Sequence, residues 1–265
     1  MPNVLLVGDS GSGKTTAIRT LVESGLETFV IFTEPMMDLL ADLPADKLHW
    51  RYIPPTTGSW DETLQKLEMM APLAWDAISK MTNDPLKSKY TQWYNFVHTF
   101  ANFHCDRTGQ DYGDVTTWGY DRALVIDGLS GVNKLALQFS CGSSVAKTLP
   151  QWGAAMDLEM GLVAEKLCFD TTCLYVLIAH LDFNKDELTG AIKFVPNALG
   201  TANGPQFPKS FNDTVHAIRD GQKFRWSTTT FNVDVKGRNL PMADNLPPHF
   251  GYLLSAWQKR VFPQS

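Results

Sequence analysis

The stretch Gly8-Asp9-Ser10-Gly11-Ser12-Gly13-Lys14-Thr15, residues 8–15, matches the phosphate-binding loop pattern GxxxxGK[ST] in full. The apolar segment 3–7 precedes it and predicts a buried strand, and residues 15–22 predict a helix. Glycines let the backbone turn so that its N–H groups face phosphate oxygens, and the helix N-terminus adds partial positive charge. The sequence therefore predicts a nucleoside-triphosphate site at this strand-to-helix turn.

The residues of this loop have separate expected tasks. Lys14 is expected to reach the β- and γ-phosphates, and the Thr15 hydroxyl is expected to hold Mg²⁺. ATP and Mg²⁺ are therefore the expected ligands. The alternative, a chance glycine-rich turn, does not account for the preceding strand, the following helix and the Lys-Thr pair. The predicted nucleotide-binding residues are Gly8, Asp9, Ser10, Gly11, Ser12, Gly13, Lys14, Thr15 and Thr16.

Length, charge and composition narrow the remaining possibilities. A chain of 265 residues can form one large α/β domain, and we expect a single domain over residues 1–265. The net charge of −5 argues against a protein that coats duplex DNA by bulk charge. The longest apolar run, 173–179, has only strand length, so we expect no membrane span, no signal peptide and a cytoplasmic protein. The four cysteines form no CxxC pair, which favours free thiols over a zinc site.

Strand and helix patterns alternate along most of the chain, and the capping-box pattern Ser59–Glu62 opens one of the helices. This order predicts an α/β fold with a mostly parallel central sheet, flanking helices and antiparallel edge strands. The expected central strands cover residues 28–33, 48–53, 123–127 and 172–179. The expected helices cover residues 59–81 and 150–169. Residues 182–212 predict a hairpin around residues 188–190 and then a Gly/Pro-rich loop. The expected edge strands cover 214–219, 223–228 and 232–235, with a tight turn at Asp220-Gly221.

Residues 83–121 interrupt the alternation, and we expect an insertion in the core there. Its first part carries aromatic residues at helical spacing, which favours packing over base stacking. Residues 105–118 are rich in glycine and aspartate and predict a loop. The aromatic residues are Tyr90, Trp93, Tyr94, Phe96, Phe100 and Phe103.

Three polar residues end predicted strands near the phosphate loop. Asp127 closes Leu-Val-Ile-Asp and is expected to hold Mg²⁺, the alternative being an acid that starts a turn. Glu34 follows the strand 28–33 and is a candidate for polarising the attacking water, the alternative being a solvated strand-end carboxylate. His180 follows Leu177-Ile178-Ala179 and is a candidate γ-phosphate sensor, the alternative being a structural histidine.

Lys236-Gly237-Arg238 lies late in the chain after a short predicted strand. Two cations at i and i+2 on an extended segment point the same way. Such a pair could enter a neighbouring subunit's active site and neutralise charge in the transition state. The alternative is a solvated basic turn.

The order of these parts resembles the RecA/KaiC/DnaB-helicase class of P-loop ATPases. In that class a catalytic glutamate, a sensor at a strand tip and a paired cationic finger recur in this order, here Glu34, His180, Lys236 and Arg238. The short length and the run 237–241 are most similar to phage-encoded RecA-like ATPases, which include Sak-type single-strand annealing proteins. The resemblance covers about residues 2–255, and the insertion 83–121 departs from it. It implies a RecA-like core, ATP hydrolysis at subunit interfaces, and a homo-oligomeric ring or filament.

The resemblance also implies that single-stranded DNA binds to loops after the Asp127 and His180 strands. The lysines expected in these loops are Lys134, Lys147, Lys185, Lys193 and Lys209, and the aromatic residues that could stack bases are Phe194, Phe207 and Phe211. The expected function is Mg²⁺-dependent ATP hydrolysis that acts on single-stranded DNA in phage recombination or replication, in the host cytoplasm.

Three other functions compete with this one. They are a DNA-translocating motor subunit of a helicase or packaging machine, an ATP-binding assembly factor with little turnover, and a small-molecule kinase. A kinase closes an arginine-bearing lid over the phosphates. Only Arg107 and Arg122 lie between residues 52 and 218, which disfavours the kinase.

Overall fold

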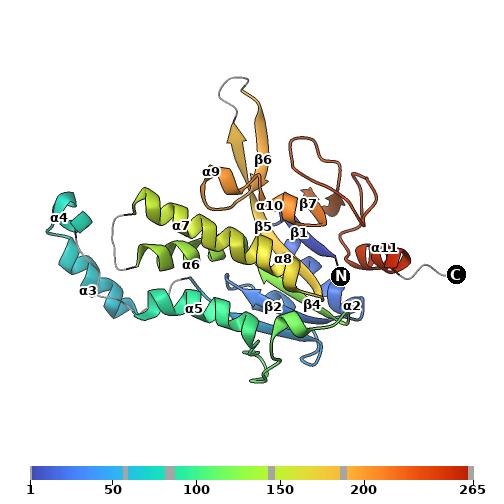
Figure 1. The fold of residues 1–265 in the computed structure, drawn as a ribbon, viewed down its shortest axis with the longest axis horizontal. Helices are drawn as coiled ribbons and strands as arrows, with labels where there is room; N and C mark the ends of the chain where they lie inside the picture. Colours follow the sequence, from blue (N-terminus) through green and yellow to red (C-terminus); the bar gives the residue numbers. More distant parts are fainter. Residues whose placement is uncertain (1, 56–58, 81–86, 143–146, 186–189, 262–265) are drawn as a thin grey trace.

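The computed structural model of the chain describes residues 2–55, 59–80, 87–142, 147–185 and 190–261. A sheet of eight strands lies at its centre, with helices on both faces (Figure 1). Seven strands follow the order β3-β2-β4-β5-β1-β7-β8, and β6 pairs with the end of β5. The strands are β1 (Asn3–Gly8), β2 (Glu27–Phe32), β3 (Leu48–Tyr52), β4 (Arg122–Asp127), β5 (Leu174–Lys185), β6 (Ile192–Pro196), β7 (Asp213–Asp220) and β8 (Lys223–Ser227).

Most neighbouring strands of this sheet run parallel. All five pairings from β3 across to β7 are parallel, whereas β8 and β6 are antiparallel to β7 and β5. The predicted α/β fold with a mostly parallel sheet, flanking helices and an antiparallel edge is therefore confirmed. Parallel strands bring their carboxyl ends to one edge of the sheet, which we call the C-terminal edge; the opposite edge is the N-terminal edge.

Alternation along the strands divides the core into two layers. On β1, Leu5 and Val7 pack into the cluster beneath the helices 87–101, 129–141 and 149–159, whereas Val4 and Leu6 pack into the cluster beneath the helices 14–17, 19–23 and 251–261. Such strands, buried on both faces, are typical of parallel sheets. The α-helices are α1 (Lys14–Ala17), α2 (Arg19–Glu23), α3 (Trp60–Met70), α4 (Trp75–Lys80), α5 (Lys87–Ala101), α6 (Leu129–Cys141), α7 (Leu149–Glu159), α8 (Leu167–Asp170), α9 (Gly200–Asn203), α10 (Phe207–Ser210) and α11 (Gly251–Val261). Short 3₁₀ turns cover Met37–Leu40 and Val115–Thr117, and a π-helical segment, Met160–Lys166, joins α7 to α8.

The late strands differ from the prediction in two ways. Residues 213–220 form β7, which is no edge strand, because it pairs with β1 on one side and β8 on the other. Residues 232–235 form no strand, because the hydrogen bonds around them are divided between two partners. The Phe194 amide donates to the Asn232 carbonyl, whereas Thr214 and Lys236 bond to each other. A segment whose partners are divided in this way cannot build a continuous ladder.

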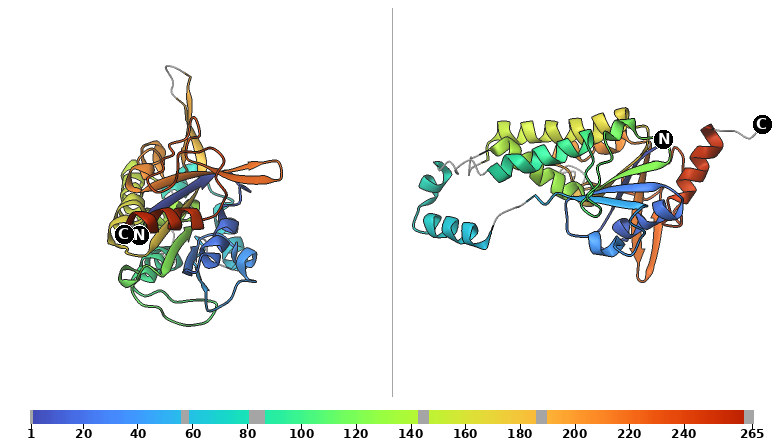
Figure 2. Two further views of the ribbon diagram at one scale, coloured as in Figure 1. Left: turned by 90° about the vertical axis from the view of Figure 1, so that its right-hand side faces the viewer. Right: turned by 90° about the horizontal axis from the view of Figure 1, so that it is seen from below.

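The predicted helix 59–81 begins as expected and ends early. The Ser59 hydroxyl accepts from the Glu62 amide, and the Glu62 carboxylate accepts from the Ser59 amide, so the capping box is confirmed. The chain then turns between α3 and α4, which extend away from the sheet (Figure 2, right). The expected end, Met81, and residues 83–86 of the expected insertion lie outside the described residues.

The aromatic residues of α5 and the loop after it pack as predicted. Trp93, Phe96, Phe100 and Phe103 are buried in the cluster beneath α6, whereas Tyr94 is exposed. The side chain of Tyr90 lies outside the described part of the chain. Packing therefore explains four of the six aromatic positions.

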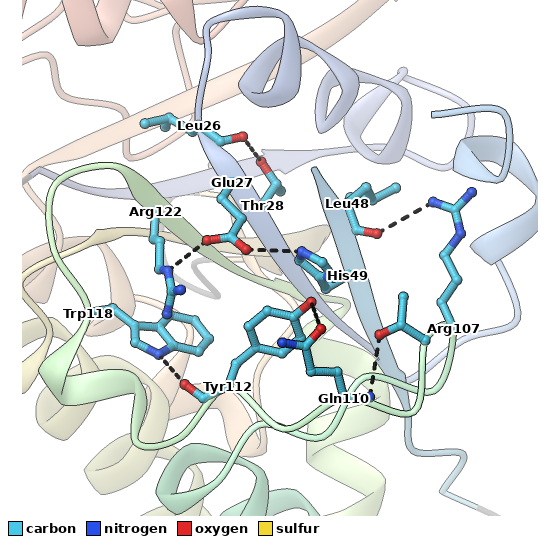
Figure 3. A network of polar contacts seen from close by, with 11 residues as sticks. Leu26, Glu27, Thr28, Leu48, His49, Arg107, Gln110, Tyr112, Trp118 and Arg122 are labelled. Carbon is cyan, nitrogen blue, oxygen red and sulfur yellow. Dashed lines mark hydrogen bonds and ion pairs between the residues drawn. The ribbon is translucent and has the colours of Figure 1, made fainter. Parts of the chain in front are cut away.

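A polar network closes the N-terminal edge of the sheet (Figure 3). The Glu27 carboxylate accepts from Arg122 Nε at 2.8 Å, and its other oxygen lies 3.2 Å from His49 Nε2. The Arg122 guanidinium also lies over the rings of Tyr112 and Trp118, at 5.9 and 5.4 Å. Burial lowers the pKa of His49, so at neutral pH its ring is uncharged and its contact with Glu27 is polar. Charge and aromatic contacts thus fasten the loop 103–121 to the sheet.

Of the helices in the described part of the chain, none has both the length and the apolar character that a membrane span requires.

Candidate functional site

The predicted loop and three of the predicted polar residues meet at the C-terminal edge of the sheet. In the strand register Gly8 lies opposite His180, and Phe32 lies opposite Asp127. The tips of β1, β5, β4 and β2 follow one another along this edge. Residues far apart in the sequence therefore converge beside the phosphate loop.

The side chain of Lys14 folds back into the phosphate loop. Its ammonium donates to the carbonyls of Gly8 and Asp9, at 2.8 and 2.7 Å, and lies 3.5 Å from His180 Nδ1. Burial lowers the pKa of Lys14 to about 8, although the charges of Asp127, Asp9 and Glu34 act in the opposite direction. The Ser12 hydroxyl, at 3.4 Å, is a further uncharged partner. A desolvated ammonium whose hydrogen-bond partners are uncharged gains most from an anionic ligand such as a phosphate.

Thr15 and Asp127, the two residues predicted to hold Mg²⁺, are in direct contact. The Thr15 hydroxyl donates to Asp127 Oδ2 at 2.7 Å. Burial raises the pKa of Asp127 to about 6, and the charge of Glu34 raises it too, whereas Thr15 and Lys14 lower it. Mg²⁺ prefers oxygen ligands and is bound by one or two carboxylates together with substrate phosphates. A buried carboxylate beside a hydroxyl and a second carboxylate fits that ion.

Glu34 lies at the tip of β2, close to the end of β4. A Cβ atom placed on Gly128 would lie 3.9 Å from Glu34 Oε1, so the carboxylate faces the residue after Asp127. The buried Thr33 hydroxyl bonds to both the carbonyl and the amide of Gly128, at 2.7 and 3.1 Å. This contact, which the sequence analysis missed, holds the two strand tips together and so positions Glu34 and Asp127.

Two histidines lie beside the loop. His180, the predicted sensor, is half-buried, and burial followed by the charge of Lys14 lowers its pKa, so the ring is neutral at pH 7. His216 on β7 lies opposite Val7, and burial lowers its pKa as well. His216 Nδ1 lies 3.1 Å from the Thr230 hydroxyl. The charges of Asp9 and Lys14 both act on His216, which no sequence pattern singled out.

Lys236 and Arg238 lie at the other edge of the sheet. Asp213, which lies opposite Val4 in the register, accepts from the amides of Arg238 and Asn239, each at 2.8 Å. Val4 precedes Gly8 by four residues, which is about 13 Å of strand. Both cations line a pocket of about 650 Å³ with Asn3, at the start of β1. The structure therefore does not bring Lys236 or Arg238 to the phosphate loop of their own chain.

Two further side chains lie against the loop from β7 and β8. A Cβ atom on Gly11 would lie 3.6 Å from the Arg219 guanidinium, and one on Gly13 would lie 3.0 Å from the Phe224 ring. The Asp220-Gly221 turn was visible in the sequence, and Gly221 has the positive φ that such a turn requires. Contact of its flanking strands with the loop was not visible, because it depends on the pairing of β7 with β1.

The residues expected to bind DNA are scattered. Phe207 and Phe211 are buried in the core and cannot stack bases, because α10 packs against the layer beneath the sheet. Lys209 lines the pocket at the N-terminal edge, far from the tip of β5. Lys134 lies within α6, and Lys147 lies in the segment between α6 and α7, 5.7 Å from the Trp152 ring.

The β5–β6 hairpin retains the other expected residues. Its predicted turn, 188–190, lies mostly outside the described residues, but the strands on either side pair as predicted. Phe183 lies directly opposite Phe194, and both remain exposed, at 63% and 39%. Lys185 shares their face, whereas Lys193 points to the other face and pairs with Asp234 at 2.7 Å.

The site was also compared with known proteins. Models of protein families give no match to this chain, and the curated proteins give no significant match. The function of this site is therefore inferred from its geometry and chemistry.

Proposed function

We propose that this chain is a Mg²⁺-dependent ATPase of the RecA-like class that acts on single-stranded DNA in phage recombination or replication. One observation carries the ATPase part of the proposal. A phosphate loop, a buried lysine, the Thr15–Asp127 pair and the Glu34 carboxylate converge at one edge of the sheet. Each performs a task that phosphoryl transfer requires.

The proposed mechanism assigns one step to each group. The loop amides and Lys14 bind and orient the triphosphate. Thr15 and Asp127 would hold Mg²⁺, which neutralises charge on the phosphates when it is bound. Glu34 accepts a hydrogen bond from the attacking water and aligns it with the γ-phosphate. His180, 3.5 Å from Lys14, is placed to register a γ-phosphate that draws the ammonium away.

The position of Lys236 and Arg238 supports assembly in the proposed function. Lys236 pairs with Thr214, which lies opposite Leu5, so it lies about 10 Å of strand from its own loop, and Arg238 lies about 13 Å away. We therefore expect both cations to contribute to hydrolysis only in a second copy of the chain. The Asp213 carboxylate accepts a hydrogen bond from the Arg238 amide, which holds the backbone there, and the Arg238 side chain is exposed. We therefore propose that subunits assemble head to tail, as a ring or filament, so that each supplies cations to its neighbour's site.

The proposed surface for single-stranded DNA is the β5–β6 hairpin. Phe183 and Phe194 form an exposed aromatic pair that could stack bases, and Lys185 on the same face could contact a phosphate. Asn197 donates to the carbonyl of His180 at 2.8 Å, which joins the base of the hairpin to the proposed sensor. A change at the γ-phosphate would thus reach the hairpin through one hydrogen bond.

The DNA proposal is tested by a salt titration of oligonucleotide binding in the presence of an ATP analogue. Replacing Phe183 and Phe194 by Ala should weaken binding, and Lys185→Ala should flatten the log–log salt slope by about 0.7, the value for one phosphate contact. Phe169→Ala, an exposed aromatic elsewhere, is the control. If the wild-type protein binds no single strand at low salt, the assembly-factor function becomes the better one.

The ATPase proposal is tested by separating binding from turnover. Glu34→Gln should keep the affinity for ATP and lose most of the hydrolysis rate, because only the activation of water is removed. Glu23→Gln, at the end of α2, is the matched control. A variant with weaker ATP binding but an unchanged rate per bound ATP would make Glu34 a structural residue.

The kinase alternative receives no support from the two arginines between residues 52 and 218. Arg107 donates to the carbonyls of Leu48 and Ala41, and Arg122 pairs with Glu27. Both lie beside the start of β3 or β4 at the N-terminal edge (Figure 3), so neither can close over the phosphates.

A further inference from the structure

The polar residues of the site are distributed unevenly along the C-terminal edge of the sheet. β1 has two neighbours, β5 on one side and β7 on the other. His180, Asp127 and Glu34, the groups proposed to act at the γ-phosphate, all lie on the β5 side. If the γ-phosphate faces β5, the nucleoside end of the same ligand leaves the loop on the side of β7 and β8.

One face of the β7–β8 hairpin runs along the phosphate loop on that side. A Cβ atom on Gly8 would lie 2.4 Å from the Ala217 carbonyl oxygen, so strand and loop are in close contact there. Arg219, two residues further along β7, lies against Gly11. Phe224 lies directly opposite Arg219 in the register, on the same face, and its ring approaches Gly13.

The two side chains offer an aromatic surface and a cation. Phe224 is 43% exposed beside a polar loop, and the Arg219 guanidinium lies 5.7 Å from the centre of its ring. Arg219 Nε donates to the Gly221 carbonyl at 2.9 Å, which holds the side chain beside the turn. Figure 2 (left) shows this hairpin, in orange, projecting from the body of the molecule. An aromatic ring and a guanidinium are the groups that bind a base and a phosphate.

We propose that this hairpin face is the nucleoside subsite of the ATP site, in which Phe224 packs against the nucleobase and Arg219 bonds to the phosphates. The inference rests on the proposed ATP binding and adds the residues that recognise the rest of the nucleotide. A flat aromatic ring stacks on any base, so Phe224 contributes affinity without choosing between bases.

Two probes distinguish the base from the phosphates. Calorimetric titration of the full chain with a non-hydrolysable ATP analogue and with inorganic tripolyphosphate compares a ligand that has a base with one that lacks it. Phe224→Ala should weaken binding of the analogue by about 5- to 150-fold, the range of one stacking contact. It should leave tripolyphosphate binding unchanged. Arg219→Ala should weaken both ligands by about tenfold or more.

Control variants keep this test specific. Phe231→Ala removes an exposed aromatic elsewhere, Arg225→Ala removes a cation from the opposite face of the hairpin, and Phe224→Tyr should retain the affinity of the wild type. Tripolyphosphate binding by Phe224→Ala also reports that its loop remains folded.

Three results would overturn the inference. If the analogue binds Phe224→Ala as tightly as the wild type while Lys14→Ala abolishes binding, Phe224 is no part of the subsite and the proposed function stands. If Phe224→Ala weakens both ligands equally, the ring only shapes the loop. If the wild-type chain binds neither ligand, the proposed function fails and the subsite fails with it.

Discussion

The two edges of the sheet both contain charged side chains, but the environments of these side chains differ. At the N-terminal edge the carboxylate of Glu27 is neutralised by Arg122 and supported by aromatic rings. At the C-terminal edge burial raises the pKa of Asp127 to about 6 and lowers that of Lys14 to about 8. The Glu27–Arg122 pair at the first edge satisfies its charges internally and thereby fastens a loop. The second keeps desolvated charges that a charged ligand would stabilise, which is the condition expected of a functional site.

The largest effect is expected from removing the buried charge of Lys14 at the C-terminal edge. Lys14→Met should abolish ATP binding and turnover, because the phosphates lose their cation. It should also raise the free energy of unfolding at pH 7, by on the order of 1–3 kcal/mol, since the depressed pKa shows that the charged form is costly in the fold. Nucleotide titration and chemical denaturation measure the two effects.

The control for this variant is Lys166→Met, which removes an exposed lysine from an i,i+4 pair and should leave both quantities nearly unchanged. A destabilised Lys14→Met protein would show that the lysine supports the fold, and the contrast between the two edges would be lost.

The second prediction concerns Arg238, which lies at the N-terminal edge of the sheet, away from the phosphate loop of its own chain. Arg238→Ala should lower turnover by about 10³-fold or more, the scale of arginine fingers. Mixing it with Lys14→Ala should restore part of the activity, because one intact composite site forms at a mixed interface. Activity is measured across mixing ratios, with co-assembly followed by mass. Variants that co-assemble but remain inactive at every ratio would exclude an effect across subunits.

The third prediction uses a buried carboxylate whose hydrogen-bond partners, within the described part of the chain, are all uncharged. Glu159 accepts from the Leu199 amide and from Asn203, and burial raises its pKa from 4.5 to about 7. A raised carboxyl pKa stabilises the fold below pH 4.5, and this contribution is lost as the pH rises through 7. The difference corresponds to about 3 kcal/mol.

The free energy of unfolding of the wild type should therefore fall between about pH 4.5 and 7 relative to that of Glu159→Gln, which cannot ionise. Denaturation curves at several pH values measure the difference between the two proteins. Parallel pH profiles would show that Glu159 is ionised at no cost, like a paired carboxylate.

The smallest effect is expected at the N-terminal edge, where Arg122 is paired with Glu27. Arg122→Ala should lower the free energy of unfolding by about 2 kcal/mol, because Glu27 loses its cation and three rings lose a contact. ATP affinity should be unchanged. Arg19→Ala, which breaks the exposed pair with Asp42, should cost less than about 1 kcal/mol. A loss of ATP affinity in Arg122→Ala, measured by calorimetry, would mean that the two edges are coupled.

Local patterns were sufficient for the loop, the central strands and the residues at their tips. The loop motif between a strand and a helix located Lys14 and Thr15, and apolar runs ending in Asp127 and His180 located the facing strand tips. These positions converge because parallel strands end at a common edge, which the alternation of strands and helices already indicates. The capping box at Ser59 was equally local, since both of its hydrogen bonds span three residues.

Long-range pairing decided what the sequence could not. Whether β7 is an edge strand, and hence whether Arg219 and Phe224 touch the loop, depends on the pairing of residues more than 200 positions apart. The burial of Phe207 and Phe211 depends on where α10 packs, and no period in a Gly/Pro-rich segment reveals it. By itself the sequence determined the phosphate loop and the class of fold, because each is written in contiguous residues. Only the tertiary structure decided which edge each charge occupies, because that follows from strand order and register, which are properties of the whole chain.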